Sequence, residues 1–164
     1  ILSGLVGSEM CIRDSYLAGL LHNFGNLVLA HVFPPHFSLI CRHLEVNPHL
    51  PHSYIEQHLL GISREQIGSW LMRYWDMPEE LAVALRFQHD PSYSGNHATY
   101  PNLVYLAVSL LHNRGIGNGP AREIPASLLD NLGITREKAE EALNKVLAAE
   151  VALRDLATQF GSPQ

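Results

Sequence analysis

Apolar residues recur every three or four positions along most of the chain, and this spacing predicts helices. The first such stretch covers residues 16–33, and because its apolar residues lie on most of its sides, a buried helix is predicted. The remaining stripe is small or polar and includes Gly19, His22 and Gly25. A glycine inside a helix lowers the stability of that helix by about 1 kcal/mol relative to alanine. The stripe therefore predicts either close packing against another helix or room for a ligand beside His22.

Proline, glycine and capping residues divide the rest of the chain into further helices. Ser63 followed by Gln66 is a capping-box pattern. Helices are predicted over residues 37–44 and 53–60, from the Ser63 cap to 74, from Pro78 onward, over 101–112, and from the Thr135 cap to 160, with a loop over 90–100. In the last helix, apolar residues recur at Ala139, Val146, Leu153 and Phe160, which we interpret as packing on the parent domain rather than a dimer seam. No alternating strand pattern of useful length occurs, so the predicted fold is an all-α bundle.

Composition narrows the class of protein. The chain has 164 residues, of which 46% are hydrophobic and 16% are charged, and these values suit one globular domain rather than a disordered tail. Only 11 residues are Lys or Arg and the net charge is −5, so we expect no nucleic-acid partner. No apolar run approaches the roughly 18 residues of a membrane-spanning helix. The two cysteines, Cys11 and Cys41, cannot form a disulfide framework, which favours a reducing cytoplasm.

Residues 1–15, ILSGLVGSEMCIRDS, are interpreted separately. They contain neither the basic start nor the small-residue cleavage site of a signal peptide. The string is similar to leaders at the ends of unrelated translated environmental reads, so we predict a non-native leader before a partial domain at 16–164. An ordinary N-terminal helix is the alternative. If an upstream part of the domain is missing, we expect an exposed apolar patch larger than a monomer usually carries.

The chain contains 10 histidines, and histidine is the commonest metal ligand in proteins. His49 and His52 lie three residues apart, but no third ligand lies near them in the sequence, so they are a weak zinc candidate. The histidines outside any motif are expected at the surface; they are His31, His36, His43, His58, His97 and His112. The histidine count alone therefore does not establish a metal site.

Short motifs, taken in order, resemble a known family. Residues 20–25 read LLHNFG, similar to the LLHDIG segment of the HD superfamily of metal-dependent phosphohydrolases, in which a His-Asp pair binds a divalent metal that activates water. The segments 56–61 (EQHLLG), 75–78 (WDMP) and 88–91 (QHDP) follow. Their order resembles the HDOD family, the HD-related output domain of bacterial signalling proteins, across about residues 16–160. The resemblance implies a helical bundle of the HD type.

The resemblance also identifies the positions of a metal site, and several of them have changed. His22 matches the first histidine, but Asn23 occupies the place of the aspartate and supplies no charge. Arg64 replaces the histidine of an H-x-x-x-G step, and a permanent cation repels a metal ion. Gln88 and His89 occupy the positions of a His-His pair, of which only His89 keeps an imidazole. We therefore expect no bound metal and no other cofactor.

The late aspartate of the HD enzymes falls near Val108, which cannot ligate a metal. The changed positions and the two retained histidines are predicted to form a vestigial, buried polar cluster, because buried polar groups need hydrogen-bond partners. In that cluster the Arg64 side chain would bond Asn23, Gln88 or a carboxylate such as that of Glu56. A pocket for a small ligand is the alternative.

These expectations lead to a prediction of function. The chain is interpreted as a non-catalytic regulatory module of a bacterial signalling protein, acting in the cytoplasm through protein partners or fused signalling domains, without nucleic acid or membrane. The alternative is an HD-type metal-dependent phosphohydrolase of nucleotides or cyclic dinucleotides with an altered metal shell. The loop after His89 lacks the DGxGYP sequence of the relatives that hydrolyse cyclic di-GMP, which disfavours that alternative. The oligomeric state is left open.

Overall fold

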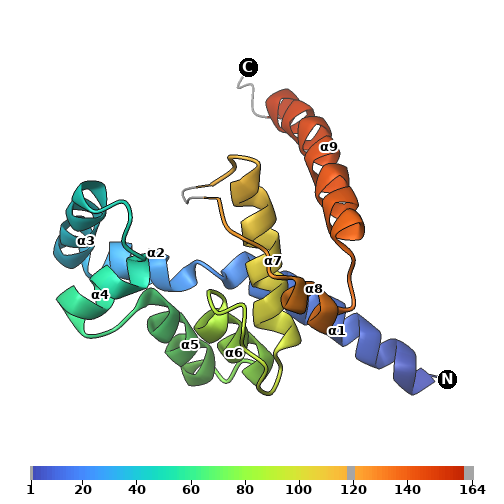
Figure 1. Ribbon diagram of the computed structural model, residues 1–164, viewed down its shortest axis with the longest axis horizontal. Helices are drawn as coiled ribbons and strands as arrows, with labels where there is room; N and C mark the ends of the chain where they lie inside the picture. Colours follow the sequence, from blue (N-terminus) through green and yellow to red (C-terminus); the bar gives the residue numbers. More distant parts are fainter. Residues whose placement is uncertain (1, 118–120, 161–164) are drawn as a thin grey trace. The chain divides into compact units, whose positions relative to one another are not determined.

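The computed structural model describes residues 2–117 and 121–160, with the side chains of 11–117 and 121–150. The described chain is helical and contains no strand, which confirms the predicted all-α class (Figure 1). The helices in order are α1 (Leu2–Leu21), α2 (Phe24–Val32), α3 (Pro34–Val46), α4 (His52–Leu60), α5 (Arg64–Tyr74), α6 (Glu79–Phe87), α7 (Thr99–Asn113), α8 (Ala126–Leu132) and α9 (Arg136–Phe160). They form two compact units, one extending to Tyr105 and the other starting at Leu106.

Helix α5 is the centre of the first unit. It packs against α2, α4 and α6, while α3 packs against α2 and α4, and α1 packs against α6. Helices α2, α3, α4 and α5 each contribute one buried residue to a common apolar core, namely Leu29, Ile40, Ile55 and Ile67. Helix α6 is buried at residues 81–85. The candidate site described below lies on the helices of this unit.

The α4–α5 connection is capped on both sides. Gly61, with a φ of +74°, ends α4 in the left-handed conformation that glycine adopts without strain. The hydroxyl of Ser63 accepts the N–H of Gln66 at 3.4 Å, and the Gln66 side chain accepts the N–H of Ser63 at 2.9 Å. The capping box expected from the sequence is therefore confirmed. The short connection brings the second turn of α4 next to the first turn of α5.

The single helix predicted over residues 16–33 is wrong, because the structure divides it into α1 and α2 at His22 and Asn23. Helix α2 packs so closely on α5 that a Cβ added to Gly25 would lie 1.9 Å from the carbonyl oxygen of Arg64. This tertiary contact fixes the direction of α2 and confirms close packing at Gly25. Nothing lies within 4 Å of the equivalent position at Gly19.

Other boundaries also differ from the sequence predictions. Helix α3 is longer than the predicted 37–44, because the two prolines at 34 and 35 begin it, as proline does well in a first helical turn. Pro78 is the N-cap of α6 rather than its first helical residue. Helix α8, which has 7 residues and ends at Gly133, was not predicted. It is too short to show a clear apolar period.

The second unit contains the end of α7 together with α8 and α9. Its described buried hydrophobic residues are Leu106, Leu110, Ile124, Leu128, Leu129, Ala139 and Leu143. The hydroxyl of Thr135 accepts the N–H of Lys138 at 3.3 Å, which confirms the predicted cap of α9. Of the residues that recur every seven positions, Ala139 is buried and Val146 is 63% exposed, while the side chains of Leu153 and Phe160 lie outside the described residues.

The burial predicted for the stretch 16–33 is wrong, because of these residues only Ala18, Gly25 and Leu29 are buried. Tyr16, Leu20 and Leu27 are 70%, 64% and 61% exposed. Residues 2–15 form the start of α1, and their non-native origin stays a prediction. Among the described residues, no single helix is long and apolar enough to cross a membrane, although the segments Cys11–Val32 and Pro34–Val46, bent by 116°, pass the same test as a pair.

Candidate functional site

An ion pair between α4 and α5 lies at the position of the changed H-x-x-x-G motif. The Glu56 side chain is completely buried, and its Oε2 accepts the backbone N–H of Arg64 at 2.8 Å. Its Oε1 accepts hydrogen bonds from the Arg64 guanidinium. The Arg64 side chain is 14% exposed, so this pair neutralises a carboxylate that would otherwise be costly to bury. Of the three partners that the sequence left open for Arg64, the structure therefore shows the carboxylate of Glu56.

A second polar contact joins the end of α6 to the turn between α1 and α2. Gln88 is buried at the C-cap of α6, and its Nε2 donates to the carbonyl oxygen of His22 at 2.8 Å and to that of Leu85 at 3.0 Å. The Nδ1 atom of His22 lies 2.6 Å from the carbonyl oxygen of Gly19. Because a carbonyl only accepts, this ring nitrogen carries the hydrogen in that contact.

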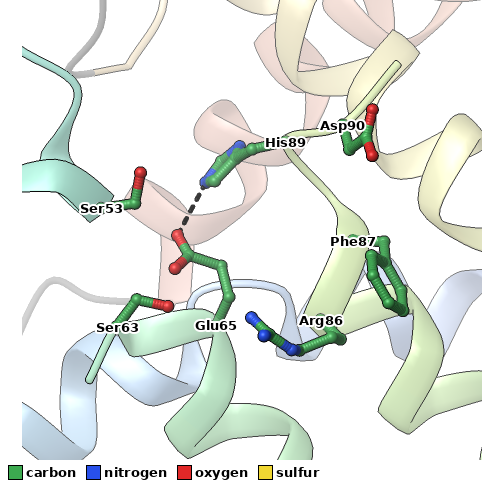
Figure 2. A pocket seen from close by; sticks show the side chains of 7 residues that line it. All are labelled: Ser53, Ser63, Glu65, Arg86, Phe87, His89 and Asp90. Carbon is green, nitrogen blue, oxygen red and sulfur yellow. Dashed lines mark ion pairs between the residues drawn. The ribbon is translucent and has the colours of Figure 1, made fainter. Parts of the chain in front are cut away.

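A third contact joins the first turn of α5 to the segment after α6. The Nε2 of His89 lies 3.3 Å from the Oε1 of Glu65, and Figure 2 shows the two side chains pointing toward one another. Burial raises the pKa of Glu65, but hydrogen bonds to His89 and Ser63 outweigh it and lower that pKa to about 2. Glu65 is therefore ionised at neutral pH, and the pair is charged whenever His89 is protonated.

A polar pocket of about 230 Å³ surrounds this pair. Its lining residues are Ser53, Ser63, Glu65, Arg86, Phe87, His89 and Asp90. The carboxylate of Asp90 points away from Glu65 in Figure 2 and accepts the N–H and hydroxyl of Ser92 at 3.0 and 2.6 Å. The Phe87 ring stacks on Tyr93 at a centroid distance of 4.0 Å. Much of the lining is thus engaged in contacts within the protein.

The structure separates the predicted cluster into pairs. Arg64 bonds Glu56, and Gln88 bonds the backbone rather than the ring of His22. The expectation of burial for the whole set is wrong, because only Glu56 and Gln88 are buried, His22 and Arg64 are half-buried, and Asn23 and His89 are exposed. The Asn23 side chain does not cap α2. The vestigial role of these residues stays a prediction.

Glu65 is the site residue that sequence reasoning missed. Its position in the first turn of α5, two residues after Ser63, is typical of an acidic residue that favours a helix N-terminus. That local role gave no reason to connect it with His89, which lies in a different motif. Of the histidines expected at the surface, His31, His36, His43, His58 and His97 are exposed, whereas His112 is half-buried.

The donor atoms at these positions do not suit the divalent metal of the HD enzymes. Such an ion needs several carboxylate and imidazole groups that converge on one point. Here Arg64 contributes a fixed cation, and Asn23 and Gln88 contribute neutral amides. Across the side chains that the structure describes, no three His, Cys, Asp or Glu residues are placed to hold a metal ion.

A family model of the HDOD domain matches residues 2–91, which is more than half of the chain. The chain belongs to the HDOD family. Among solved structures, this HDOD chain is similar to a candidate signal transduction protein from Marinobacter aquaeolei VT8, with 45% identity and a TM-score of 0.78 over 91% of this chain. This neighbour and the family fit a regulatory module.

Two further comparisons place the HDOD chain among its relatives. A candidate phosphohydrolase from Shewanella amazonensis SB2B shares the fold, with 20% identity and a TM-score of 0.63. The match covers 80% of this chain and 49% of the Shewanella chain. A Treponema pallidum (strain Nichols) protein, described only as uncharacterized, is 26% identical over 138 residues, which are 84% of this chain. The HDOD chain spans 26% of the Treponema protein and 33% of the Marinobacter chain.

Proposed function

We propose that this HDOD chain is a non-catalytic module that relays a signal by presenting its helical surface to a protein partner or to another domain of the same polypeptide. The observation that carries the proposal is the Arg64 guanidinium, held by buried Glu56 at the position where the HD resemblance places a metal-binding histidine. A fixed cation at this position opposes binding of a divalent metal. The metal-activated water of the HD enzymes would then have no counterpart in this chain.

Exposed aromatic side chains support a role in protein binding. Trp70 and Tyr74 of α5 and its C-cap Trp75 are 52%, 84% and 50% exposed. Tryptophan and tyrosine are enriched among the residues that contribute most to protein–protein affinity. The chain also has a net charge of −5, which disfavours nucleic acid as the partner. We place the module in the cytoplasm of a bacterium, in keeping with the reduced state expected for its two cysteines.

The decisive experiment measures metal content and hydrolysis together. The untagged chain is purified, incubated with Mn²⁺ or Fe²⁺, desalted and assayed by inductively coupled plasma mass spectrometry. The same samples are tested for hydrolysis of cyclic di-GMP and of guanosine tetraphosphate. We expect metal far below one equivalent per chain and no turnover, because the donor set lacks the charged oxygen ligands that such ions need.

Paired variants make the result specific. His22→Ala/His89→Ala removes both retained imidazoles of the HD positions, and His31→Ala/His58→Ala removes two exposed histidines as the matched control. Under the proposal, neither pair changes metal content or turnover. Stoichiometric metal and turnover that only the His22/His89 variant abolishes would establish the alternative, a phosphohydrolase with an altered metal shell.

A further inference from the structure

The turn between α1 and α2 has an unusual hydrogen-bonding arrangement. In a continuous helix the carbonyl of His22 would accept the N–H of Asn26. Instead, Asn26 and Leu27 both donate to the carbonyl of Asn23, at 3.1 and 3.4 Å. The freed carbonyl of His22 accepts the side-chain amide of Gln88 at 2.8 Å, a contact between residues 66 positions apart. The orphan carbonyl at the end of α1 is therefore satisfied by a side chain from α6.

Both hydrogens of the Gln88 amide nitrogen have acceptors. The second goes to the carbonyl of Leu85 at 3.0 Å, within the last turn of α6. Since an amide NH₂ has two donors, the side chain bridges the end of α6 and the end of α1 with its full donor capacity. Gln88 is 3% exposed, so water does not easily replace either bond.

The helices around this bridge differ in how firmly they are held. Helix α2 is fixed on α5, because Gly25 approaches the backbone of Arg64 too closely for any side chain. Helix α6 packs on α5 and is buried along most of its length. Helices α2, α5 and α6 therefore form a block. Helix α1 joins the block through the turn at His22 and Asn23 and through its packing on α6.

We propose that Gln88 is a clasp that fixes the direction in which α1 leaves this block, with the turn at His22 and Asn23 as its hinge. Movement of the segment after α6, where His89 is exposed and pairs with Glu65, would withdraw the amide from His22. The carbonyl of His22 would then accept from Asn26, and α1 and α2 would straighten toward one helix. That this movement carries a signal rests on the proposed function, whereas the clasp itself does not.

The test replaces Gln88 by methionine, which has a similar length but no donor. We expect about five-fold faster hydrogen–deuterium exchange at the amide of Asn26, because this amide must leave the carbonyl of Asn23 each time the turn opens toward the straight arrangement. Spin labels at Leu20→Cys and Tyr74→Cys, which are 64% and 84% exposed, report the α1–α5 distance after both native cysteines are changed to serine. The distribution of distances between these labels should broaden or shift in Gln88→Met.

The matched control is Gln57→Met. Gln57 is an exposed glutamine whose Nε2 donates to the carbonyl of Gly61 at 2.7 Å, so the control loses a bond of the same kind away from the hinge. It should leave both readouts at wild-type values. Equal exchange and equal distance distributions in Gln88→Met and the wild type would overturn the clasp.

A second variant covers the case in which Gln88→Met does not fold. Gln88→Asn keeps the amide but shortens the side chain by one methylene, so it cannot reach both acceptors. The same changes are expected, and wild-type behaviour of this variant would also overturn the clasp. Both readouts are structural, so hydrolysis or metal binding by the chain would refute the proposed function without affecting them.

Discussion

Removal of the Arg64 side chain should destabilise the first unit strongly, because it leaves the carboxylate of Glu56 buried without its cation. Breaking a buried ion pair by deleting one partner costs about 3–5 kcal/mol. The backbone N–H of Arg64 still donates to Glu56 at 2.8 Å in the Arg64→Ala variant, so we expect about 3 kcal/mol. For a chain of this length, each kcal/mol corresponds to roughly 2–4 °C in Tm.

The assay is urea unfolding followed by tryptophan fluorescence. Both tryptophans, Trp70 and Trp75, belong to the first unit, so the signal reports the unit that contains the pair. Glu56→Gln removes the buried charge and leaves an arginine that is 14% exposed to water, so its cost should be smaller, about 1–2 kcal/mol. The double variant contains no unpaired buried carboxylate. Its loss should therefore be less than the sum of the two single losses.

The control is the exposed pair between Arg73 and Glu79, whose nitrogen and oxygen lie 2.7 Å apart with both side chains about half exposed. Arg73→Ala should change the free energy of unfolding by at most about 0.5 kcal/mol, because solvent screens such pairs. A loss below about 1 kcal/mol for Arg64→Ala, or additive losses in the double variant, would show that Glu56 does not depend on the guanidinium.

Three further predictions concern the same unit. Gly25→Ala should lower the free energy of unfolding by about 2 kcal/mol or more, because its Cβ would meet a backbone carbonyl of α5 at 1.9 Å. Gly19→Ala, with nothing within 4 Å of its Cβ, should raise the free energy of unfolding by about 0.5–1 kcal/mol. Thermal unfolding of both variants checks these values. Ser63→Ala should cost about 1 kcal/mol in urea unfolding through loss of the cap. The pKa of Glu65 is lowered from 4.5 to about 2, so its ionised carboxylate stabilises the fold above pH 4.5. This contribution of about 3 kcal/mol to the free energy of unfolding is lost as the pH falls through 2. The stability of Glu65→Gln should therefore vary less with pH over that range, and a parallel profile for the two proteins would contradict the lowered pKa of Glu65.

The fold could be predicted where the determining interactions are local. The capping box at Ser63 and the glycine that ends α4 are set by neighbouring residues, and both are found in the structure. The break between α1 and α2 is different, because it depends on Gly25 meeting the backbone of Arg64 and on Gln88 reaching His22. Those contacts join distant parts of the chain, and no periodicity within residues 16–33 records them.

The candidate site shows the same division. The family resemblance drew attention to Arg64 and left Asn23, Gln88 or a carboxylate such as that of Glu56 as its partner, and the structure shows the bond to Glu56. It did not identify Glu65, whose partner His89 is supplied by tertiary packing of α6 on α5. The sequence also predicted too much burial, because a motif gives the order of residues but not the depth at which the fold places them. Asn23 is an example, since it was expected to be buried and is exposed.

The ion pair between Arg64 and Glu56 limits how this fold could respond to a signal. The guanidinium is part of α5 and remains next to Glu56 while the first unit is folded, so the contact between α4 and α5 does not change at low cost. The contacts that can change at low cost are the weaker ones. His89 is exposed and lies 3.3 Å from Glu65, and Gln88 beside it holds the end of α1 by a single hydrogen bond worth about 1 kcal/mol. A signal that reaches this fold would therefore act on the segment after α6 rather than on the contact between α4 and α5.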